Sequence, residues 1–202
     1  MDDCSTDNSR DVIERYRNHE RVSHIVFNEA NSGSTFSQWA KGIRLAKGKY
    51  IWIAESDDWC EPELLDTVIN GMDETCVLGY AQSLVVSGDG RVLWNSRAER
   101  FEETVSGGEF VSRHMLTKNS IVNASMALFR KECFEKVGND FTRFRFCGDW
   151  LFWILVAVQG NVFISGKVLN YFRKHGSDVS GKAFQEGLYY SEYIQLMEVL
   201  TQ

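Results

Sequence analysis

The chain has 202 residues and a formal net charge of −6, from 22 Lys plus Arg and 28 Asp plus Glu. Its length suffices for one domain with a hydrophobic core. Apolar residues make up 44% of the sequence and charged residues 25%, which excludes a disordered or low-complexity chain. No block of basic residues stands out, so duplex nucleic acid is not an expected partner.

Hydropathy and cysteine spacing bear on membrane insertion, secretion and cellular compartment. The longest unbroken apolar run covers nine residues, 150–158, whereas a membrane-spanning helix needs roughly 20, so no span is predicted. The first 20 residues are polar and charged and do not resemble a signal peptide. The five cysteines are widely spaced, without a disulfide framework or a CxxC metal motif. This pattern favours a reducing, cytoplasmic location.

The first part of the chain alternates helical and strand patterns. The expected elements, in chain order, are a helix at 9–18, a strand at 22–27, a helix from about 36, a buried strand at 50–54 and a helix from 62 to 72. Phe36 begins an i, i+4, i+7 apolar repeat, and Gly48 is placed to end that helix. Pro62 is tolerated in a first helical turn. This alternation predicts an α/β fold with a parallel sheet.

The second part contains a hairpin signal followed by further helices and strands. The expected elements are strands at 77–86 and 91–94, a helix at 106–116, a strand at 124–129, a helix at 131–137, a helix at 149–159, strands at 162–164 and 168–172, and a helix at 184–200. Ser106 and Glu109 form a capping box. The helix at 149–159 is apolar nearly all round and should be buried. Leu188, Ile194 and Met197 are expected to form the apolar positions of the last helix.

The sequence Glu55-Ser56-Asp57-Asp58 is the sharpest chemical feature. It follows a buried strand, and open α/β sheets bind ligands at the carboxyl ends of their strands. Neighbouring carboxylates repel one another unless a cation lies between them, and oxygen ligands favour Mg²⁺ or Mn²⁺. The alternative is a polar strand end at which Asp58 caps the next helix.

Two further polar segments are weak signals when each is taken alone. Residues 2–9, Asp-Asp-Cys-Ser-Thr-Asp-Asn-Ser, could simply cap the following helix. Residues 31–34, Asn-Ser-Gly-Ser, lead into another helix and could form a further polar wall of a site.

Taken in order, these motifs closely resemble the nucleotide-sugar glycosyltransferases of the large inverting family 2. The resemblance is carried by residues 2–9, by Asn31-x-Gly33 and by the run Gly48-Lys49-Tyr50-Ile51-Trp52-Ile53-Ala54-Glu55-Ser56-Asp57-Asp58. It continues more loosely through 123–130, 148–150 and 171–175. It implies a GT-A fold, which is an α/β fold with a mixed, mostly parallel sheet flanked by helices.

The resemblance also implies roles for individual residues. The donor-binding residues would be Asp2, Asp3, Asn31, Gly33, Glu55, Asp57, Arg173 and His175, with Asp2 and Asp3 at the nucleoside. Asp57 and Asp58 would bind a Mn²⁺ or Mg²⁺ cofactor, and Asp149 would be the catalytic base. Glu55 departs from the family pattern, which usually has Asp at this position.

Structural alternatives remain open for several of these residues. Asp149 could be an ordinary helix N-cap, and Arg173 and His175 could lie on a plain surface loop. Asn123 and Ser125 could face the acceptor or merely pack in a strand. Four tryptophans could stack on sugars, although Trp153 is expected in the core: Trp39, Trp59, Trp150 and Trp153.

Family members begin with a strand, a helix and a second strand before the Asp-Asp-x-Ser loop, and this opening of roughly 30 residues has no counterpart here. The chain is therefore expected to be a single, N-terminally truncated GT-A domain. Its parts would be a partial nucleotide-sugar-binding half at 1–75, an acceptor-side half at 76–182 and a C-terminal helix at 183–202. Exposed strand edges recruit other chains, so a homodimer is expected.

The function expected from this resemblance is inverting transfer of a sugar from a nucleotide-diphosphate donor, with UDP preferred, to an acceptor hydroxyl. The acceptor would be a glycan or lipid-linked glycan in cell-surface polysaccharide synthesis, at the cytoplasmic face of the membrane. The alternative is a truncated, non-catalytic remnant of such an enzyme. A receiver-like or phosphatase-like domain is a weaker interpretation, because a suitably placed nucleophile and lysine pattern are lacking.

Overall fold

The computed structural model describes residues 1–174 and 187–200. The chain divides into two compact units, an N-terminal unit of residues 1–47 and a sheet unit of residues 48–202. The N-terminal unit holds helices α1 (Ser9–Glu14) and α2 (Thr35–Leu45).

Helix α2 follows the predicted pattern. Its N-cap residue, Ser34, has an extended backbone, and its hydroxyl accepts a hydrogen bond from the Ser37 N–H at 3.2 Å. This bond satisfies one of the free N–H groups of the first turn. The buried side chains recur at the helical period along one face of α2: Phe36, Trp39, Ala40 and Ile43. Trp39 is therefore a buried residue.

The expected strand at 22–27 is not formed. Phe27 makes only an isolated parallel bridge to Asp2, which is too little backbone pairing to define a strand. The helix expected at 9–18 is also shorter and ends at Glu14. β-branched composition favours a strand, but a strand forms only where a partner runs beside it over several residues.

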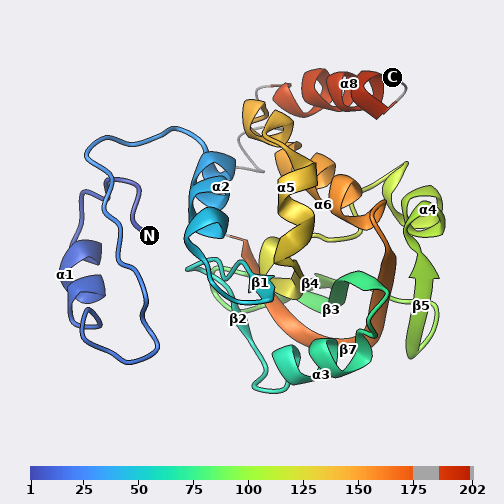
Figure 1. The fold of residues 1–202 in the computed structure, drawn as a ribbon, viewed down its shortest axis with the longest axis horizontal. Helices are drawn as coiled ribbons and strands as arrows, with labels where there is room; N and C mark the ends of the chain where they lie inside the picture. The colour runs from blue at the N-terminus through green and yellow to red at the C-terminus, as the bar shows by residue number, and fades with distance from the viewer. Residues whose placement is uncertain (175–186, 201–202) are drawn as a thin grey trace. The chain divides into compact units, whose positions relative to one another are not determined.

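The sheet unit contains a seven-stranded sheet with the order β1-β6-β3-β7-β2, in which β4 also pairs with β3 and β5 with β7 (Figure 1). The strands are β1 (Tyr50–Trp52), β2 (Trp59–Cys60), β3 (Cys76–Ser87), β4 (Val92–Asn95), β5 (Glu102–Ser106), β6 (Ala127–Arg130) and β7 (Asn161–Lys174). The predicted hairpin of β3 and β4 is confirmed.

The sheet is mixed, as expected, but the expectation that it is mostly parallel is wrong for the described strands. Only β3 and β7 run parallel, and the other five pairings are antiparallel. A parallel pair needs a long crossover, whereas short connections such as the one from β3 to β4 reverse the chain direction. Strand β7 is also continuous through Ser165-Gly166, which the sequence pattern had suggested as a break between two strands.

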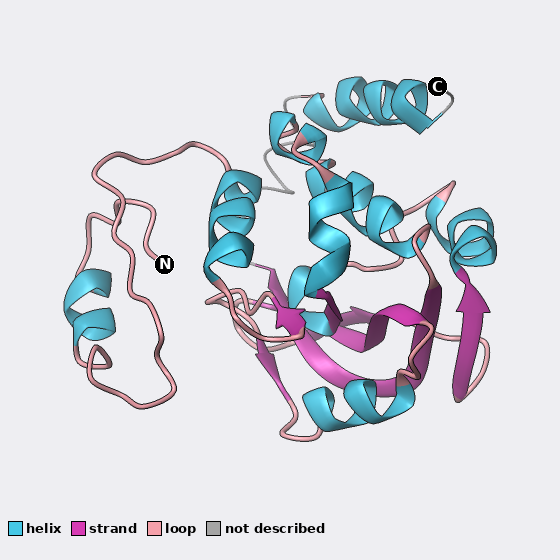
Figure 2. Cartoon of the chain, viewed as in Figure 1, coloured by secondary structure: helices cyan, strands magenta, loops and turns pink. Residues whose placement is uncertain are grey.

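Helices cover both faces of the sheet (Figure 2). They are α3 (Leu64–Gly71), α4 (Gly107–Phe110), α5 (Phe134–Val137), α6 (Gly148–Ala157) and α8 (Leu188–Leu200), with a π-helical turn at Val111–Met115 and 3₁₀ turns at Ala124–Met126, Lys131–Cys133 and Asp140–Arg143. Helix α3 lies on one face, and α5 and α6 lie on the other.

Neighbouring residues of β6 show how the core fills both faces. Leu128 joins the cluster built around Val68 of α3, whereas Phe129 packs edge-on against Phe152 and Trp153 of α6. Successive side chains of a strand point to opposite faces, so this interior strand buries side chains on both of its faces. As predicted, α6 is almost entirely buried, and Trp153 lies in the core.

The contact between Gly107 and Ala157 generates a stability prediction. A Cβ atom added to Gly107 would lie 1.8 Å from the carbonyl oxygen of Ala157, whereas one added to Gly108 would meet nothing within 4 Å. We expect Gly107→Ala to destabilise the protein by about 1–3 kcal/mol and to lower Tm by about 2–4 °C per kcal/mol in thermal denaturation. Gly108→Ala is the matched control and should leave Tm unchanged or raise it; equal effects of the two variants would contradict the prediction.

Candidate active site

The acidic loop 55–58 follows β1 and is fixed by a buried serine. The Ser125 hydroxyl accepts a hydrogen bond from the Glu55 N–H at 3.0 Å, and the Ser125 carbonyl accepts one from the Trp52 indole N–H at 2.8 Å. Ser125 is only 2% exposed. It therefore shapes the loop rather than facing an acceptor.

Asp58 is held by neutral donors from distant parts of the sheet unit. Its carboxylate accepts from the Asn123 side-chain amide at 2.6 Å and from the Arg173 backbone N–H at 3.2 Å. Burial raises the pKa of Asp58, although the hydrogen bonds from Asn123, Ser125 and Arg173 oppose this shift. Asp58 does not cap α3, whose N-cap residue is Glu63.

The orientation of Asn123 is set inside the sheet. Its carbonyl oxygen accepts from the Ser83 hydroxyl and from the Asn170 amide, each at 3.0 Å, and Asn170 also donates to Ser83 at 2.7 Å. These three side chains are all buried. Because both donors occupy the carbonyl side, the NH₂ group of Asn123 faces Asp58. Asn123 thus supports the acidic loop. The sequence had allowed two other roles for it, acceptor binding and packing in a strand.

Glu55 is a buried carboxyl that is repelled by neighbouring carboxylates. Burial, and then the charges of Asp58, Asp57 and Asp149, raise the pKa of Glu55 from 4.5 to about 8. Three predicted site residues of the sheet unit therefore act electrostatically on a fourth. A protonated Glu55 or a bound cation would relieve this repulsion.

Asp149 lies in the first turn of α6, beyond the N-cap residue Cys147, so it is not the N-cap that the sequence had offered as an alternative. Its carboxylate accepts from the Trp150 N–H at 2.7 Å and from the Asn119 side-chain amide at 2.9 Å. Burial raises the pKa of Asp149 from 3.8 to about 7, against the opposing effect of these hydrogen bonds. The group can therefore exchange a proton near neutral pH.

Arg173 lies within β7 rather than on a surface loop, and its guanidinium is placed by aromatic rings. The guanidinium carbon lies 5.1 Å from the centroid of the Trp59 ring. Trp59 is 41% exposed, and it stacks on Tyr171 with 5.1 Å between ring centroids and an interplanar angle of 7°. Trp59 thus already contacts protein groups, and it supports Arg173 at the strand end beside Asp58. His175 lies outside the described residues.

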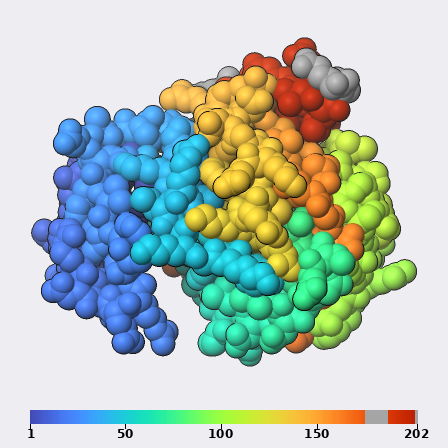
Figure 3. All heavy atoms as spheres, viewed as in Figure 1, coloured from blue at the N-terminus to red at the C-terminus, as the bar shows by residue number. Residues whose placement is uncertain are grey.

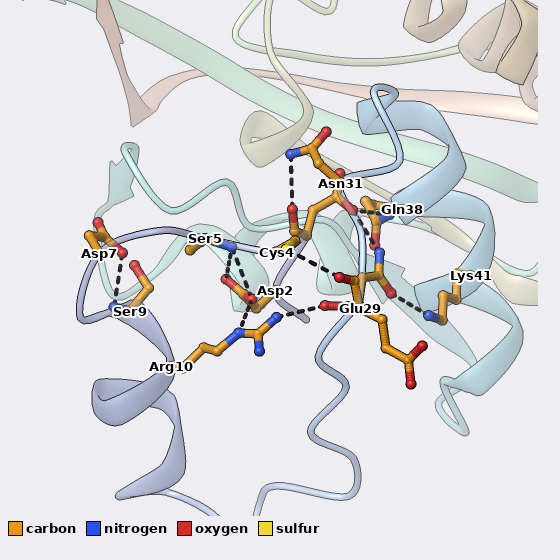
Figure 4. A network of polar contacts seen from close by, with 12 residues as sticks. Asp2, Cys4, Ser5, Asp7, Ser9, Arg10, Glu29, Asn31, Gln38 and Lys41 are labelled. Carbon is orange, nitrogen blue, oxygen red and sulfur yellow. Dashed lines mark hydrogen bonds and ion pairs between the residues drawn. The ribbon is translucent and has the colours of Figure 1, made fainter.

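The predicted site residues of the N-terminal unit form their own network (Figure 4). Asp2 is 4% exposed. Its carboxylate accepts from the Ser5 N–H at 3.2 Å and from the Arg10 side chain at 3.1 Å. Hydrogen bonding from Ser5 lowers the pKa of Asp2, and Arg10 adds to this effect. The Asp2 carboxylate therefore stays charged and anchors the start of the chain to α1.

Asp3 gathers the second polar segment of this unit. Its carboxylate accepts from the Asn28 amide at 2.7 Å and from the Ser32 hydroxyl at 2.7 Å. Burial raises the pKa of Asp3, but these hydrogen bonds outweigh it and lower the pKa overall. Asn31 donates to the Asp3 carbonyl and accepts from the Gly33 N–H. Gly33 has a φ of +69°, which glycine adopts without strain. The structure thus brings Asp3, Asn31 and Gly33 together.

Sequence reasoning missed four supporting residues: Asn119, which binds Asp149; Ser83 and Asn170, which orient Asn123; and Glu192 of α8, whose carboxylate accepts three backbone N–H groups. None of them belongs to a motif, and each contacts a partner far away in the sequence. Trp150 is buried, and its indole N–H donates to the Met115 carbonyl. The sequence had suggested that Trp150 could stack on a sugar.

Two properties of the described residues bear on cofactors and membranes. Across 1–174 and 187–200, no three or more His, Cys, Asp or Glu side chains form a group that could by itself hold a metal ion. Within the same ranges, no helix has both the length and the apolar character needed to cross a bilayer. All five cysteines are free thiols.

Known structures define the class of fold. The crystal structure of residues 1–349 of Staphylococcus aureus TarS, in complex with UDP-GlcNAc, superposes with a TM-score of 0.66 and 20% sequence identity, covering 88% of this chain and 49% of that 1–349 chain. This similarity, together with the mixed sheet flanked by helices, shows the GT-A fold that the sequence predicted.

The family model described as "Glycosyl transferase family 2" matches residues 1–138, and the chain belongs to this family. TuaG of Bacillus subtilis (strain 168), a glycosyltransferase assigned provisionally to teichuronic acid biosynthesis, is 26% identical over 133 residues, which are 65% of this chain and 49% of TuaG. Glycosyltransferase GlyG of Streptococcus pneumoniae serotype 4 (strain TIGR4) is 26% identical over 189 residues, covering 88% of this chain and 61% of GlyG. The chain thus spans about half to three-fifths of the length of these relatives.

The raised pKa of Asp149 generates a prediction about stability. Between about pH 4 and pH 7 the folded protein keeps a proton on Asp149 that the unfolded chain releases, so this group makes the protein less stable as pH rises through that window. An asparagine side chain cannot ionise, so the Tm of Asp149→Asn minus that of the wild type should be more positive at pH 8 than at pH 5. Asp66→Asn, at an exposed position of α3, is the control. A difference independent of pH would contradict the prediction.

Proposed function

We propose that the protein is an inverting glycosyltransferase that moves a sugar from a UDP-sugar to an acceptor hydroxyl during synthesis of a cell-surface polysaccharide. The observation that carries the proposal is the electrostatic coupling of the acidic loop 55–58 to Asp149, a carboxyl whose pKa burial raises to about 7. Membership of glycosyl transferase family 2 supports the proposal. So do the TarS structures, whose ligands are UDP-GlcNAc and UDP.

In this reaction Asp149 is the general base. The acceptor oxygen attacks the anomeric carbon, the bond from that carbon to the diphosphate oxygen breaks, and the hydroxyl proton passes to the Asp149 carboxylate. Inversion follows from attack opposite the leaving diphosphate. A base is most effective when its pKa lies near the working pH, and a pKa of about 7 meets this condition. Asn119 and the Trp150 N–H orient the carboxylate.

Asp57 and Asp58 are the proposed holders of Mn²⁺ or Mg²⁺. Mg²⁺ is commonly bound through one or two carboxylates, with substrate phosphates and water completing its coordination, so a site of two aspartates fits a metal that arrives with a diphosphate. Burial and the neighbouring carboxylates together raise the pKa of Glu55, and the repulsion among these carboxylates favours a cation at this loop. When bound, the ion would stabilise the charge that develops on the leaving diphosphate.

The remaining donor contacts are proposed residue by residue. In the sheet unit, Arg173 would bind the diphosphate, with His175 from the adjoining residues, and Glu55 would contact the donor. The cation–π contact with Trp59 supports the placement of Arg173. In the N-terminal unit, the residues proposed to bind the nucleoside are Asp2, Asp3, Asn31 and Gly33. The polar network among Asp3, Asn31 and Gly33 supports this role.

The acceptor is proposed to be a glycan or lipid-linked glycan, because one relative, TarS of Staphylococcus aureus, is a poly(ribitol-phosphate) beta-N-acetylglucosaminyltransferase. A location in the cytoplasm at the inner face of the membrane remains a prediction, and the free thiols are consistent with it. A homodimer likewise remains a prediction. The competing function is a non-catalytic remnant, which would bind neither nucleotide nor metal.

The role of Asp149 leads to a kinetic prediction. Asp149→Asn should lower UDP release from UDP-N-acetylglucosamine or UDP-glucose at least about a hundredfold, since a general base contributes about 10²–10⁴ in rate. Affinity for UDP, measured by calorimetry, should stay within about twofold. Wild-type turnover should rise with pH through about pH 7, because the base must be ionised. Turnover that falls less than about threefold would assign the base to another residue.

The acidic loop leads to a metal prediction. A panel of nucleotide diphosphates with and without Mn²⁺ should show metal-dependent thermal stabilisation by UDP, which amounts to about 2.7 kcal/mol at 100 times Kd. Asp58→Asn should remove the metal-dependent part of this shift, whereas Asp66→Asn should retain it. EDTA should abolish turnover, and Mn²⁺ or Mg²⁺ should restore it. Full turnover in EDTA would remove the metal from the mechanism, and no binding of any nucleotide would favour the non-catalytic remnant.

A further inference from the structure

Glu192 is a buried carboxylate that contacts the segment just before Asp149. It lies on α8 and is 5% exposed. One of its oxygens accepts from the Arg145 backbone N–H, and the other accepts from the N–H groups of Phe146 and Cys147, each bond at 2.8 Å. A carboxylate can accept several such bonds, so one side chain orders three consecutive residues.

These three N–H groups immediately precede α6. The N-cap residue of α6, Cys147, provides no side-chain cap, and Glu192 supplies acceptors from another helix in its place. Asp149 follows two residues after the last of the three N–H groups. The direction of the backbone at 145–147 therefore determines where the Asp149 carboxylate points.

Aromatic contacts hold α8 in place on both sides of Glu192. Tyr189 packs against Phe146 with 5.6 Å between ring centroids, and Tyr193 packs against Trp150 at 5.5 Å. These positions form one face of α8 at the helical period: Tyr189, Glu192, Tyr193 and the fully buried Leu196. In Figure 3 the C-terminal helix, in red, adjoins the orange segment that leads into α6.

This face differs from the one that hydropathy predicted for α8. Ile194, which was expected to be one of its apolar positions, is 59% exposed. A carboxylate occupies the buried side instead. Burial of an acidic group is costly unless its hydrogen bonds are satisfied, and here backbone donors of the 145–147 segment satisfy them.

We propose that Glu192 is a positioning residue for Asp149: through this carboxylate, α8 fixes the segment 145–147 and thereby the direction in which Asp149 meets the acceptor hydroxyl. The effect on catalysis rests on the proposed role of Asp149 as the base, whereas the anchoring itself does not. The charged and titratable groups that act on Asp149 or sense its charge are Glu192 from α8, Glu55 from the acidic loop, and the thiol of Cys147. The negative charge of Glu192 adds to the burial that raises the pKa of Asp149.

The anchoring is tested first in the wild type, by hydrogen–deuterium exchange. The amides of residues 145–147 should exchange slowly, although they precede the helix. Glu192→Gln keeps the size of the side chain but replaces one acceptor oxygen with a donor, so exchange at 145–147 should accelerate at least about tenfold. Glu198→Gln, the same chemical change at an exposed position of α8, should leave it unchanged. Fast exchange in the folded wild type would overturn the proposal whether or not any variant folds.

Two further measurements separate positioning from a purely structural role. Titration of Asp149 by carboxyl ¹³C NMR should give a lower pKa in Glu192→Gln than in the wild type or Glu198→Gln. With UDP-N-acetylglucosamine as donor, kcat of Glu192→Gln should fall at least about tenfold with the donor KM within about twofold, and the acid limb of the pH profile should move to lower pH. Glu192→Asp, which keeps the charge, should retain the position of that limb.

The outcomes distinguish this inference from the proposed function. One outcome is that Asp149→Asn abolishes turnover while Glu192→Gln changes neither exchange at 145–147, nor the pKa of Asp149, nor kcat. In that case the positioning role of Glu192 is wrong, and Asp149 is still the base. If Asp149→Asn leaves turnover intact, the proposed base is wrong. The exchange and NMR measurements then still decide whether Glu192 anchors the segment and acts on the charge of Asp149.

Discussion

The structure depends on holding several carboxylates close together with neutral hydrogen-bond donors. The donors to Asp58 and to Asp149 include an asparagine side chain and a backbone N–H in each case, and Glu192 accepts from three backbone N–H groups. Such donors satisfy the oxygens but leave their negative charge in place. Lysine or arginine would neutralise that charge. Negative potential therefore accumulates, and burial together with this potential raises the pKa of Glu55 to about 8. Protonation of one carboxylate, or a cation nearby, would relieve the repulsion among these carboxylates.

The sheet is organised to sustain this arrangement. Its central pair of strands, β3 and β7, carries buried polar side chains that include Ser83 and Asn170. These two residues orient Asn123 toward Asp58. A hydrogen-bonded network in a low-dielectric interior resists movement, because each paired group would lose its partner on moving, although the side-chain oxygen of Asn170 accepts no hydrogen bond from the residues that the structure describes. Helices on both faces then keep water away from the network. The apolar core thus affects the chemistry of the site, because the coupling among its carboxylates is stronger where water is excluded.

Local signals in the sequence predicted much of the fold and part of the site. The apolar period of α2 and the turn between β3 and β4 each depend on residues a few positions apart, and both were confirmed. The direction of strand pairing was not predictable in this way, because it depends on which strands meet. The Asn123–Asp58 contact joins residues 65 positions apart. Glu192 was missed because hydropathy assigns a carboxylate to the exposed face of a helix.

The pairing of β3 with β7 also bears on how the protein folds. Asn170 and Ser83 are 87 residues apart in the chain, and the polar network exists only after these strands have met. Closing so long a loop has an entropic cost that must be met before any of its contacts forms, and folds dominated by such contacts form slowly. We therefore expect the donors that hold Asp58 to come together late in folding. Chains that have formed only their local helices and the β3–β4 hairpin would have the acidic loop but not the framework that gives it its electrostatic character.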